Sequence, residues 1–279
     1  MAPTRISWVA MVPSDWVDRR QRFRALHRDG LFVMPNPWDI GSARLLASLG
    51  FHALATTSSG HAAALGRADQ TVSRDELLAH VEALTAAVDV PFNVDAERCF
   101  ADDPARVAET VDLIAKAGAA GCSIEDYDPR SGAIDLIDVA AERVAAAAEA
   151  ARRHGVVLTA RAENHLYGID DLDDTITRLC AYRDAGAEVL YAPGLVDRAA
   201  IASVVAGVGV PVNVLAMRHG PTVAELAAIG VRRVSTGGSL ARAAYGALVT
   251  AARELHSTGS STYLDAAISG RDLDTALNS

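Results

Sequence analysis

Charged side chains recur in this sequence directly after short apolar runs. Asp95 and Glu97 follow one such run, Glu125 follows the next, and Arg161 and Glu163 follow a third. In a parallel α/β protein the carboxyl ends of the strands meet on one face, where active sites are built. Carboxylates and one cation on such a face suit a hard divalent metal beside an anionic substrate.

Each of these side chains also has a plainer interpretation. Asp95 and Glu97 are two residues apart, so on a strand both point to the same side and can share one cation directly or through water. The alternative is a pair of surface charges at the start of a loop.

Arg161 is suited to clamp a carboxylate or phosphate, because its fork is planar and always charged. An ion pair with Glu125 or Glu163 is the alternative, and the two roles are compatible.

Eight apolar runs of strand length recur along the chain, each followed by a stretch compatible with a helix. The stretch 75–88, for example, places Leu77, Val81 and Leu84 at helical spacing. Eight strand–helix units predict an α/β fold of the (β/α)8 TIM-barrel type. An open doubly wound sheet is the rival, but no GxGxxG motif follows the first strand. The predicted strands are residues 31–35, 52–58, 91–97, 121–126, 156–163, 188–194, 211–216 and 232–238.

No linker divides the chain, so we predict a single barrel domain over residues 1–279. We expect residues 1–30 to form a lead-in segment and a helix, in which residues 14–28 close the bottom of the barrel. The barrel itself takes up residues 31–256. Residues 257–279 form a C-terminal tail with a hinge and a short helix at 264–269.

Composition limits the functions that the chain can have. A formal net charge of −9 without a basic stripe argues against nucleic acid as a partner. No apolar stretch of about 18 or more residues lacks charges, so no membrane span is expected. The three cysteines show no metal-binding spacing, and so few thiols fit a reducing, cytoplasmic location. A small molecule is therefore the expected partner, and the charges described above suit an anionic one.

Seven short motifs together resemble the isocitrate lyase/phosphoenolpyruvate mutase superfamily, over roughly residues 30–255. The most specific are SIED, the downstream ARAEN and the LGRAD loop. The resemblance implies a (β/α)8 barrel that binds Mg²⁺, with Mn²⁺ as a substitute, and a keto acid or its enolate. The motifs are Trp-Asp (38–39), TTSSG (56–60), LGRAD (65–69), VDAE (94–97), SIED (123–126), ARAEN (160–164) and RRVSTG (232–237).

The resemblance also implies roles for individual residues. Asp95 is the expected direct metal ligand, and Asp69, Glu97 and Glu125 are expected to hold metal-bound waters. Arg161 is expected to grip the substrate carboxylate. The predicted catalytic residues are Arg161, Glu163 and His165, of which His165 can donate a proton from its loop or be an ordinary loop histidine. The predicted substrate-binding residues are Thr57, Ser58, Ser59, Gly60, Asp39, Arg161 and Asn213.

The expected reaction is C–C bond cleavage through a metal-stabilised enolate, by a lyase, an oxaloacetate-type decarboxylase or a β-keto-acid hydrolase. The alternatives are a P–C bond mutase or hydrolase, and a non-catalytic relative that binds keto acids. The catalytic Cys loop of lyase members has no match in residues 127–135, so the general acid is not identified. The resemblance also implies a homo-oligomer, a dimer or a tetramer, since family members often build tetramers by exchanging the last helix between subunits.

Overall fold

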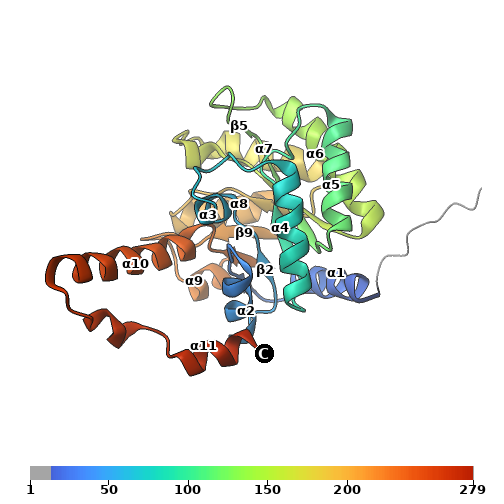
Figure 1. The fold of residues 1–279 in the computed structure, drawn as a ribbon. Coiled ribbons are helices and arrows are strands. Elements are labelled where there is room, and N and C mark those ends of the chain that lie inside the picture. Colours follow the sequence, from blue (N-terminus) through green and yellow to red (C-terminus); the bar gives the residue numbers. More distant parts are fainter. Residues whose placement is uncertain (1–13, 279) are drawn as a thin grey trace, which may run out of the picture.

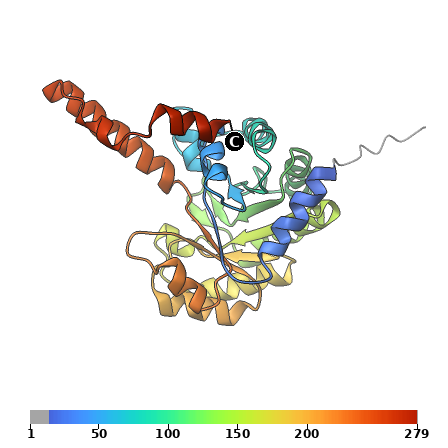
Figure 2. The same cartoon turned by 90° about the horizontal axis from the view of Figure 1, so that it is seen from below.

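The computed structural model describes residues 14–278, and its centre is a barrel of eight parallel strands (Figures 1 and 2). Each strand lies inside a range predicted from the sequence, and the predicted (β/α)8 barrel is confirmed. Neighbours follow the order β1-β10-β9-β8-β7-β4-β3-β2, with every adjacent pair parallel. The strands are β1 (Phe32–Met34), β2 (Leu54–Ala55), β3 (Phe92–Asp95), β4 (Gly121–Glu125), β7 (Val157–Arg161), β8 (Val189–Tyr191), β9 (Val212–Leu215) and β10 (Arg233–Ser235).

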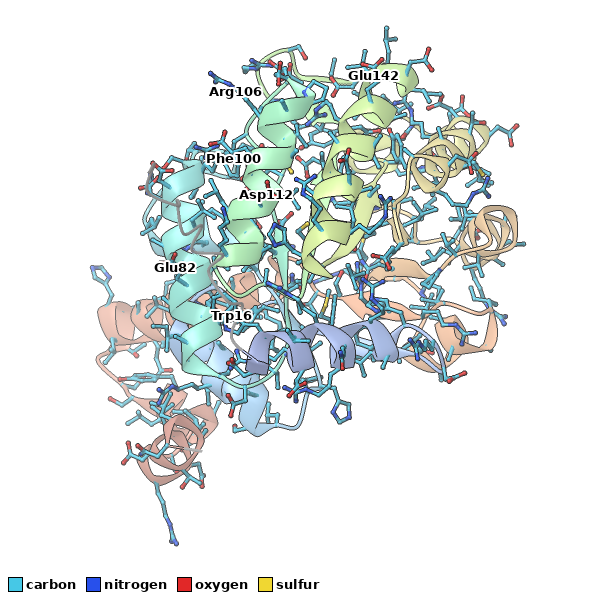
Figure 3. The ribbon with its side chains drawn as sticks, turned by 90° about the vertical axis from the view of Figure 1, so that its right-hand side faces the viewer. Trp16, Glu82, Phe100, Arg106, Asp112 and Glu142 are labelled. Carbon is cyan, nitrogen blue, oxygen red and sulfur yellow. The ribbon has the colours of Figure 1, made fainter. Side chains whose placement is uncertain are left out.

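Helices cover the outside of the barrel, and Figure 3 looks at the face where α4, α5 and α6 lie side by side. Helix α5 shows why they form. Asp103 caps its first turn by accepting two backbone N–H bonds of 2.8 and 3.1 Å, and Pro104 follows at the first helical position. Its buried face carries Val107, Val111 and Ile114. The outer helices are α2 (Ile40–Ser48), α3 (Ser58–Ala64), α4 (Arg74–Ala87), α5 (Pro104–Lys116), α6 (Ile137–His154), α7 (Leu172–Asp184), α8 (Arg198–Val208) and α9 (Val223–Ala228). Helix α10 (Ser239–Thr258) follows β10 and extends away from the barrel, with Ala241 buried near its start (Figures 1 and 2).

Helix α1 (Ser14–Leu26) lies across the amino-terminal ends of the strands, as predicted for a helix that closes the barrel bottom. Its Phe23 is fully buried in a cluster with Phe32, Val157 and Val189. Residues 1–13 of the predicted lead-in segment lie outside the described residues.

The barrel closes between β1 and β2, which stand at the two ends of the strand order. The Ala55 N–H donates to the Pro35 carbonyl across this seam (3.1 Å). The side chain of Asn36 adds one hydrogen bond across this seam and two to the loop after β10. Its Nδ2 donates to the Thr56 carbonyl (2.7 Å), and its Oδ1 accepts from the N–H groups of Thr236 and Gly237 (2.9 Å each). One side chain therefore joins the ends of β1, β2 and β10 at the mouth of the barrel.

A short antiparallel hairpin, β5 (Tyr127–Asp128) and β6 (Ala133–Ile134), follows β4 and was not predicted from the sequence. A 3-10 turn, η1 (Asn164–Tyr167), follows β7. In the described residues no helix is both long enough and apolar enough to cross a membrane.

The C-terminal tail differs from the prediction. Helix α10 ends at Thr258, and the tail then forms η2 (Thr262–Ala266) and α11 (Gly270–Leu277). The predicted helix at 264–269 is wrong, because Ser269 caps the start of α11 by accepting from the Asp272 N–H (3.1 Å). Helix α11 returns to α2 of the same chain, where Arg44 Nη1 donates to the Leu277 carbonyl (2.5 Å) (Figure 2). Exchange of this helix between subunits stays a prediction.

Candidate active site

A cavity of about 620 Å³ opens at the carboxyl ends of the strands, where active sites of this fold lie. Asp95 ends β3, Arg161 ends β7 and Tyr191 ends β8, so parallel strands bring these three side chains to one mouth. Side chains from the loops after β2, β9 and β10 complete the wall. Of the predicted site residues, those that line the cavity are Thr57, Ser58, Ser59, Asp69, Asp95, Arg161 and Asn213.

Arg161 holds three carboxylates from three strand ends. Its Nη1 donates to Asp95 Oδ1 (2.8 Å), its Nε donates to Glu163 Oε1 (2.7 Å), and its Nη2 lies 3.2 Å from Glu125 Oε2. The guanidinium carbon also lies 5.3 Å from the centre of the Tyr191 ring, within range of a cation–π contact. The ion pairs of Arg161 with Glu125 and Glu163, which the sequence analysis gave as the alternative role of this arginine, are therefore present. They leave the second N–H of each terminal nitrogen as a potential donor to a ligand.

Asp95 is fixed from two further directions. Its Oδ2 accepts from the Ser58 N–H (3.1 Å), and its own N–H donates to Thr56 Oγ1 (2.8 Å). Asp69 lies close enough that burial, together with the charge of Asp95, raises the pKa of the Asp69 carboxyl. The Asp69 side chain accepts from the Gln70 N–H (2.9 Å), so the loop before α4 delivers it.

Glu97 and Glu125 extend the acidic group behind Asp95. Glu97 is 7% exposed, and burial with the charges of Asp95 and Asp69 raises its pKa to about 8. Glu97 borders a neighbouring cleft, beside Gln70, rather than the main cavity. Glu125 Oε1 accepts from Gln70 Nε2 (3.0 Å), and burial raises the Glu125 pKa well above its usual range.

These carboxylates fit a hydrated divalent cation better than a directly chelated one. The residues that the structure describes contain no group of three or more His, Cys, Asp or Glu side chains arranged around one ion position. Yet the three carboxyl groups lie close together, since the charge of Asp95 contributes to the raised pKa values of Asp69 and Glu97. Mg²⁺ keeps several waters and takes one or two carboxylates, so one direct ligand with water-bridged neighbours suits this donor set.

A second layer of contacts positions Glu163. Its N–H donates to Asp126 Oδ1 (2.9 Å), and the Tyr182 hydroxyl donates to Asp126 Oδ2 (2.6 Å). Arg178 Nη1 also lies 3.4 Å from Asp126 Oδ2. Asp126 is 1% exposed and thus supports the strand ends from behind. Glu163 Oε2 is buried and has no hydrogen-bond partner among the described residues.

The loop after β2 brings hydroxyl groups to the cavity. Thr57, Ser58 and Ser59 line it, whereas Gly60 does not. The Gly60 N–H donates to Thr57 Oγ1 (3.3 Å), which caps α3, and a Cβ at Gly60 would lie 3.1 Å from Trp38 Cβ. Gly60 is therefore required for close packing, and its N–H is not available to a ligand.

Two further predicted residues lie away from the cavity wall. Asp39 caps α2, with its Oδ1 accepting from the Ser42 N–H (2.7 Å), so its role is to start that helix. His165 has its ring Nδ1 3.3 Å from Asp170 Oδ1, and its Nε2 is buried. Its neighbour Leu166 lines the cavity instead, so the structure does not bring the His165 ring to the reacting position.

The floor of the cavity holds a buried cation that the sequence analysis missed. Arg233 is 1% exposed and donates from Nε to Asn213 Oδ1 (2.9 Å) and from Nη2 to Thr159 Oγ1 (2.9 Å). Its Nη1 lies 3.2 Å from Nε2 of His27, the residue that directly follows α1. Burial lowers the Arg233 pKa to about 9. Arg233 lies in the RRVSTG motif, but no site role was predicted for it, because the start of β10 lies at the end of the barrel opposite the expected active face.

The sequence analysis also missed Tyr191, because a tyrosine in an apolar run is typical of an ordinary strand. Burial raises its pKa to about 12, so its hydroxyl stays protonated. Cys99, by contrast, is excluded as an acid, because it is fully buried and its pKa is raised to about 12. Among the described residues, neither a cysteine nor a histidine lines the cavity.

Comparisons with known proteins agree with this architecture. The model of the family described as phosphoenolpyruvate phosphomutase matches residues 23–256. A crystal structure from Burkholderia cenocepacia J2315, provisionally described as a lyase/mutase, is 50% identical with a TM-score of 0.91, over 95% of this chain and 97% of that chain. Oxaloacetate acetylhydrolase, solved with its product oxalate, is 27% identical with a TM-score of 0.83, over 93% of each chain. A Corynebacterium glutamicum protein named as a probable 2-methylisocitrate lyase is 30% identical over 258 residues, which cover 88% of this chain and 83% of that protein.

Proposed function

Because the chain belongs to the isocitrate lyase/phosphoenolpyruvate mutase superfamily of lyases and mutases, we propose that it is a Mg²⁺-dependent enzyme that breaks a carbon–carbon bond. Its substrate is a small 2-oxo or 2-hydroxy carboxylate. One observation carries the proposal. Asp95, Arg161 and the Ser58 N–H meet at one rim of the cavity, and further carboxylates stand behind them. In this arrangement, carboxylates that suit a cation lie beside an arginine that suits a substrate carboxylate.

Asp95 is the proposed direct ligand of Mg²⁺, with Mn²⁺ as a substitute. We assign Asp69, Glu97 and Glu125 to its waters, because burial raises the pKa of each carboxyl group and the charges of nearby carboxylates raise it further. When bound, the ion supplies Lewis-acid stabilisation of the negative charge that develops on the substrate oxygen. A divalent cation would also favour the ionised forms of these carboxyl groups.

Arg161 orients the substrate carboxylate. Glu163, Glu125 and Asp95 fix the guanidinium in place, so little side-chain freedom is lost when a ligand binds. The Tyr191 ring covers one face of the cation and keeps water from it. The hydroxyl groups of Thr57 and Ser59 lie 3.2 Å apart, so one donates to the other and the second can donate to a substrate oxygen.

The bond that breaks leaves its electron pair on the fragment that becomes an enolate. In a decarboxylase the bond lies one carbon beyond the oxo carbon, and CO2 leaves. In a retro-aldol lyase the hydroxyl group gives its proton to a base, and the hydroxyl carbon becomes the carbonyl of the second product. In a hydrolase water adds to the oxo carbon, which becomes a carboxylate as the enolate departs. A retro-aldol lyase, an oxaloacetate-type decarboxylase and a β-keto-acid hydrolase share this step. Tyr191 and the wall hydroxyls are the proton donors that the described cavity wall offers.

The P–C bond alternative has less support from the site. No histidine lines the described cavity wall at the end of β8, where Tyr191 and Pro193 lie. A histidine that transfers a proton or binds a phosphoryl group is therefore missing from this wall. A relative that binds keto acids without turnover is the other alternative. It would have the same metal and carboxylate site, so only a turnover assay separates it from an enzyme.

Oxalate binding tests the proposal without assuming a substrate. We expect oxalate, as an enolate mimic, to raise the melting temperature in Mg²⁺ and to have no effect in EDTA. Asp95→Asn should abolish the shift. Glu142→Gln, on the outer surface of α6 (Figure 3), should keep it. Equal oxalate binding with and without Mg²⁺, or full binding by Asp95→Asn, would reject the metal assignment.

Turnover is then tested with 2-oxo and 2-hydroxy acids, among them oxaloacetate and methylisocitrate, and with phosphonopyruvate. Formation of a keto-acid product from a carbon substrate supports C–C cleavage. Turnover of phosphonopyruvate alone would replace the proposal with P–C chemistry. Oxalate binding with no turnover of any compound would identify a non-catalytic relative.

A further inference from the structure

The floor of the cavity carries a buried cation that the proposed chemistry does not use. We propose that Arg233 and Asn93 bind a small monovalent inorganic anion, of the size of chloride, as a resident counter-ion. The anion lies one layer of side chains below the charged groups of the barrel mouth. This inference goes beyond the proposed function and does not rest on it, because the site uses neither the metal ligands nor Arg161.

The polar floor follows from the spacing of residues along the strands. Side chains two positions apart on a strand point to the same side. Asn93 stands two residues before Asp95, and Thr159 stands two residues before Arg161. A strand that delivers a charged side chain to the mouth therefore also delivers a polar side chain to the layer below. Barrels of this fold usually fill their interior with branched apolar side chains, so this polar layer is a departure that suits a polar ligand.

The Arg233 guanidinium lies across the centre of the barrel. Strand β10, which carries Arg233, stands three places from β7, yet Nη2 donates to Thr159 Oγ1 on β7 (2.9 Å). Nε donates to Asn213 Oδ1 on the adjacent strand (2.9 Å), and Nη1 donates to Nε2 of His27 below the barrel (3.2 Å). The guanidinium therefore lies between the cavity and the apolar cluster that α1 forms with the strand starts.

No carboxylate of residues 14–278 forms an ion pair with Arg233. Its three partners are an amide, a hydroxyl group and an imidazole that accepts a hydrogen bond, and none of them carries a negative charge. Burial lowers the Arg233 pKa to about 9, and no carboxyl group lies close enough to raise it. Two of the five N–H bonds of the guanidinium also have no acceptor in the described part of the protein. A buried charge is costly unless a counter-charge and hydrogen bonds replace its water.

Asn93 offers further donors at the same level of the barrel. It is 4% exposed and lines the cavity, and its buried Oδ1 has no hydrogen-bond partner among the described residues. Its Nδ2 makes no hydrogen bond with the described chain either, so both of its N–H bonds can be donated to a ligand. A Cβ at Gly121 would lie 2.7 Å from Asn93 Oδ1, so the glycine leaves room for this amide. Guanidinium and amide N–H groups together suit an anion.

The charge of the cavity lining favours an anion of single charge. Its ionised side chains are mostly basic, so the lining attracts anions. One buried guanidinium is balanced by one negative charge, whereas a divalent anion would leave a surplus charge without water. The charged residues of the lining are Arg161, Arg218, Arg233, Arg242, Asp69 and Asp95.

Bromide, a heavier substitute for chloride, tests the site in the parent protein. We would dialyse the protein into halide-free buffer and measure its melting temperature in rising concentrations of sodium bromide. A ligand at about ten times its dissociation constant should raise the melting temperature of a chain of this length by roughly 3 °C or more.

Variants separate specific binding from a general effect of salt. Arg233→Met removes the cation, and Asn93→Asp places a protein carboxylate where the anion would lie, so both should lose the bromide shift. Arg232→Met is the matched control and should keep the shift, because the Arg232 side chain donates to the Gly30 carbonyl (3.2 Å) and does not line the cavity. Aspartate has the shape of asparagine, so Asn93→Asp keeps the test decisive if Arg233→Met does not fold.

Crystals soaked in sodium bromide locate the ion by its anomalous scattering. We expect bromide beside the Arg233 guanidinium and the Asn93 amide, both in the free protein and with oxalate and Mg²⁺ bound. Three results would overturn the inference: no bromide shift in the parent, a shift of equal size in Asn93→Asp, or bromide found only at Arg161 and displaced by oxalate.

Discussion

His27 offers a test of the cavity floor by its effect on stability. The residue is 7% exposed, and its Nδ1 lies 2.9 Å from the Phe23 carbonyl while its Nε2 lies 3.2 Å from Arg233 Nη1. A guanidinium can only donate hydrogen bonds. Nε2 must therefore accept, Nδ1 must carry the proton that is donated to Phe23, and the ring must be neutral. Burial and the charge of Arg233 lower the His27 pKa from 6.5 to about 3.

The sign and size of the effect follow from this pKa. Below pH 6.5 the unfolded chain takes up a proton at His27 that the folded chain does not, so the free energy of unfolding falls as the pH falls, down to about pH 3. Each pH unit is worth about 1.36 kcal/mol. Between pH 6.5 and 4.5, His27 therefore removes about 2.7 kcal/mol of stability.

Urea unfolding of the parent protein and of His27→Gln, at pH 7.0 and at pH 4.5, measures this quantity. Glutamine can also donate to Phe23 and accept from Arg233, but it does not titrate. Carboxylates titrate in both proteins, so their contribution cancels in the difference. We expect the stability of the variant relative to the parent to improve by about 2.7 kcal/mol at the lower pH.

His52→Gln, the same substitution at an exposed position, provides the control for the loss of a histidine ring. If the free energies of the parent and of His27→Gln fall in parallel from pH 7.0 to 4.5, the neutral, buried histidine under Arg233 is refuted. Arg233 would then have to be held in another way.

Three other substitutions have defined outcomes. Arg161→Met leaves three carboxylates without their cation, so it should cost about 3–5 kcal/mol in urea unfolding and abolish oxalate binding in calorimetry; unchanged stability would contradict the clamp. Cys99→Ala should change the turnover rate little, because this thiol is buried and protonated; a fall in turnover rate beyond about a hundredfold would identify Cys99 as a catalytic acid. Gly238→Ala should displace Ser59 and raise KM in steady-state assays, and an unchanged KM would show that the loop can yield.

The barrel could be predicted from the sequence because each strand is an apolar run that ends in a turn or a charge. The same regularity placed Asp95, Glu125 and Arg161 together, since the ends of neighbouring parallel strands must meet. The hairpin β5–β6 escaped notice because Tyr127–Asp128 and Ala133–Ile134 are too short and too polar to show an alternating pattern.

Other parts of the site depend on contacts between distant segments. Arg233 stands at a strand start, and only the packing of α1 under the barrel brings His27 to it. Asp39 and Gly60 sit in motifs shared with the family, yet local capping and close packing account for both. A motif marks such a residue as required, but the contacts show whether it serves the helix or the ligand.

The seam between β1 and β2 gives the barrel one place where it can open locally. Elsewhere neighbouring strands share a ladder of backbone bonds, but here one backbone bond, from the Ala55 N–H to the Pro35 carbonyl, and one side-chain bond, from Asn36 to the Thr56 carbonyl, cross the seam. Breaking them would expose the Ala55 N–H to water while the other strands stay paired. Amide hydrogen exchange at Ala55 should therefore be faster than in β4 and β7. Because Thr57 follows the seam directly, such opening would also move the hydroxyl loop that lines the cavity.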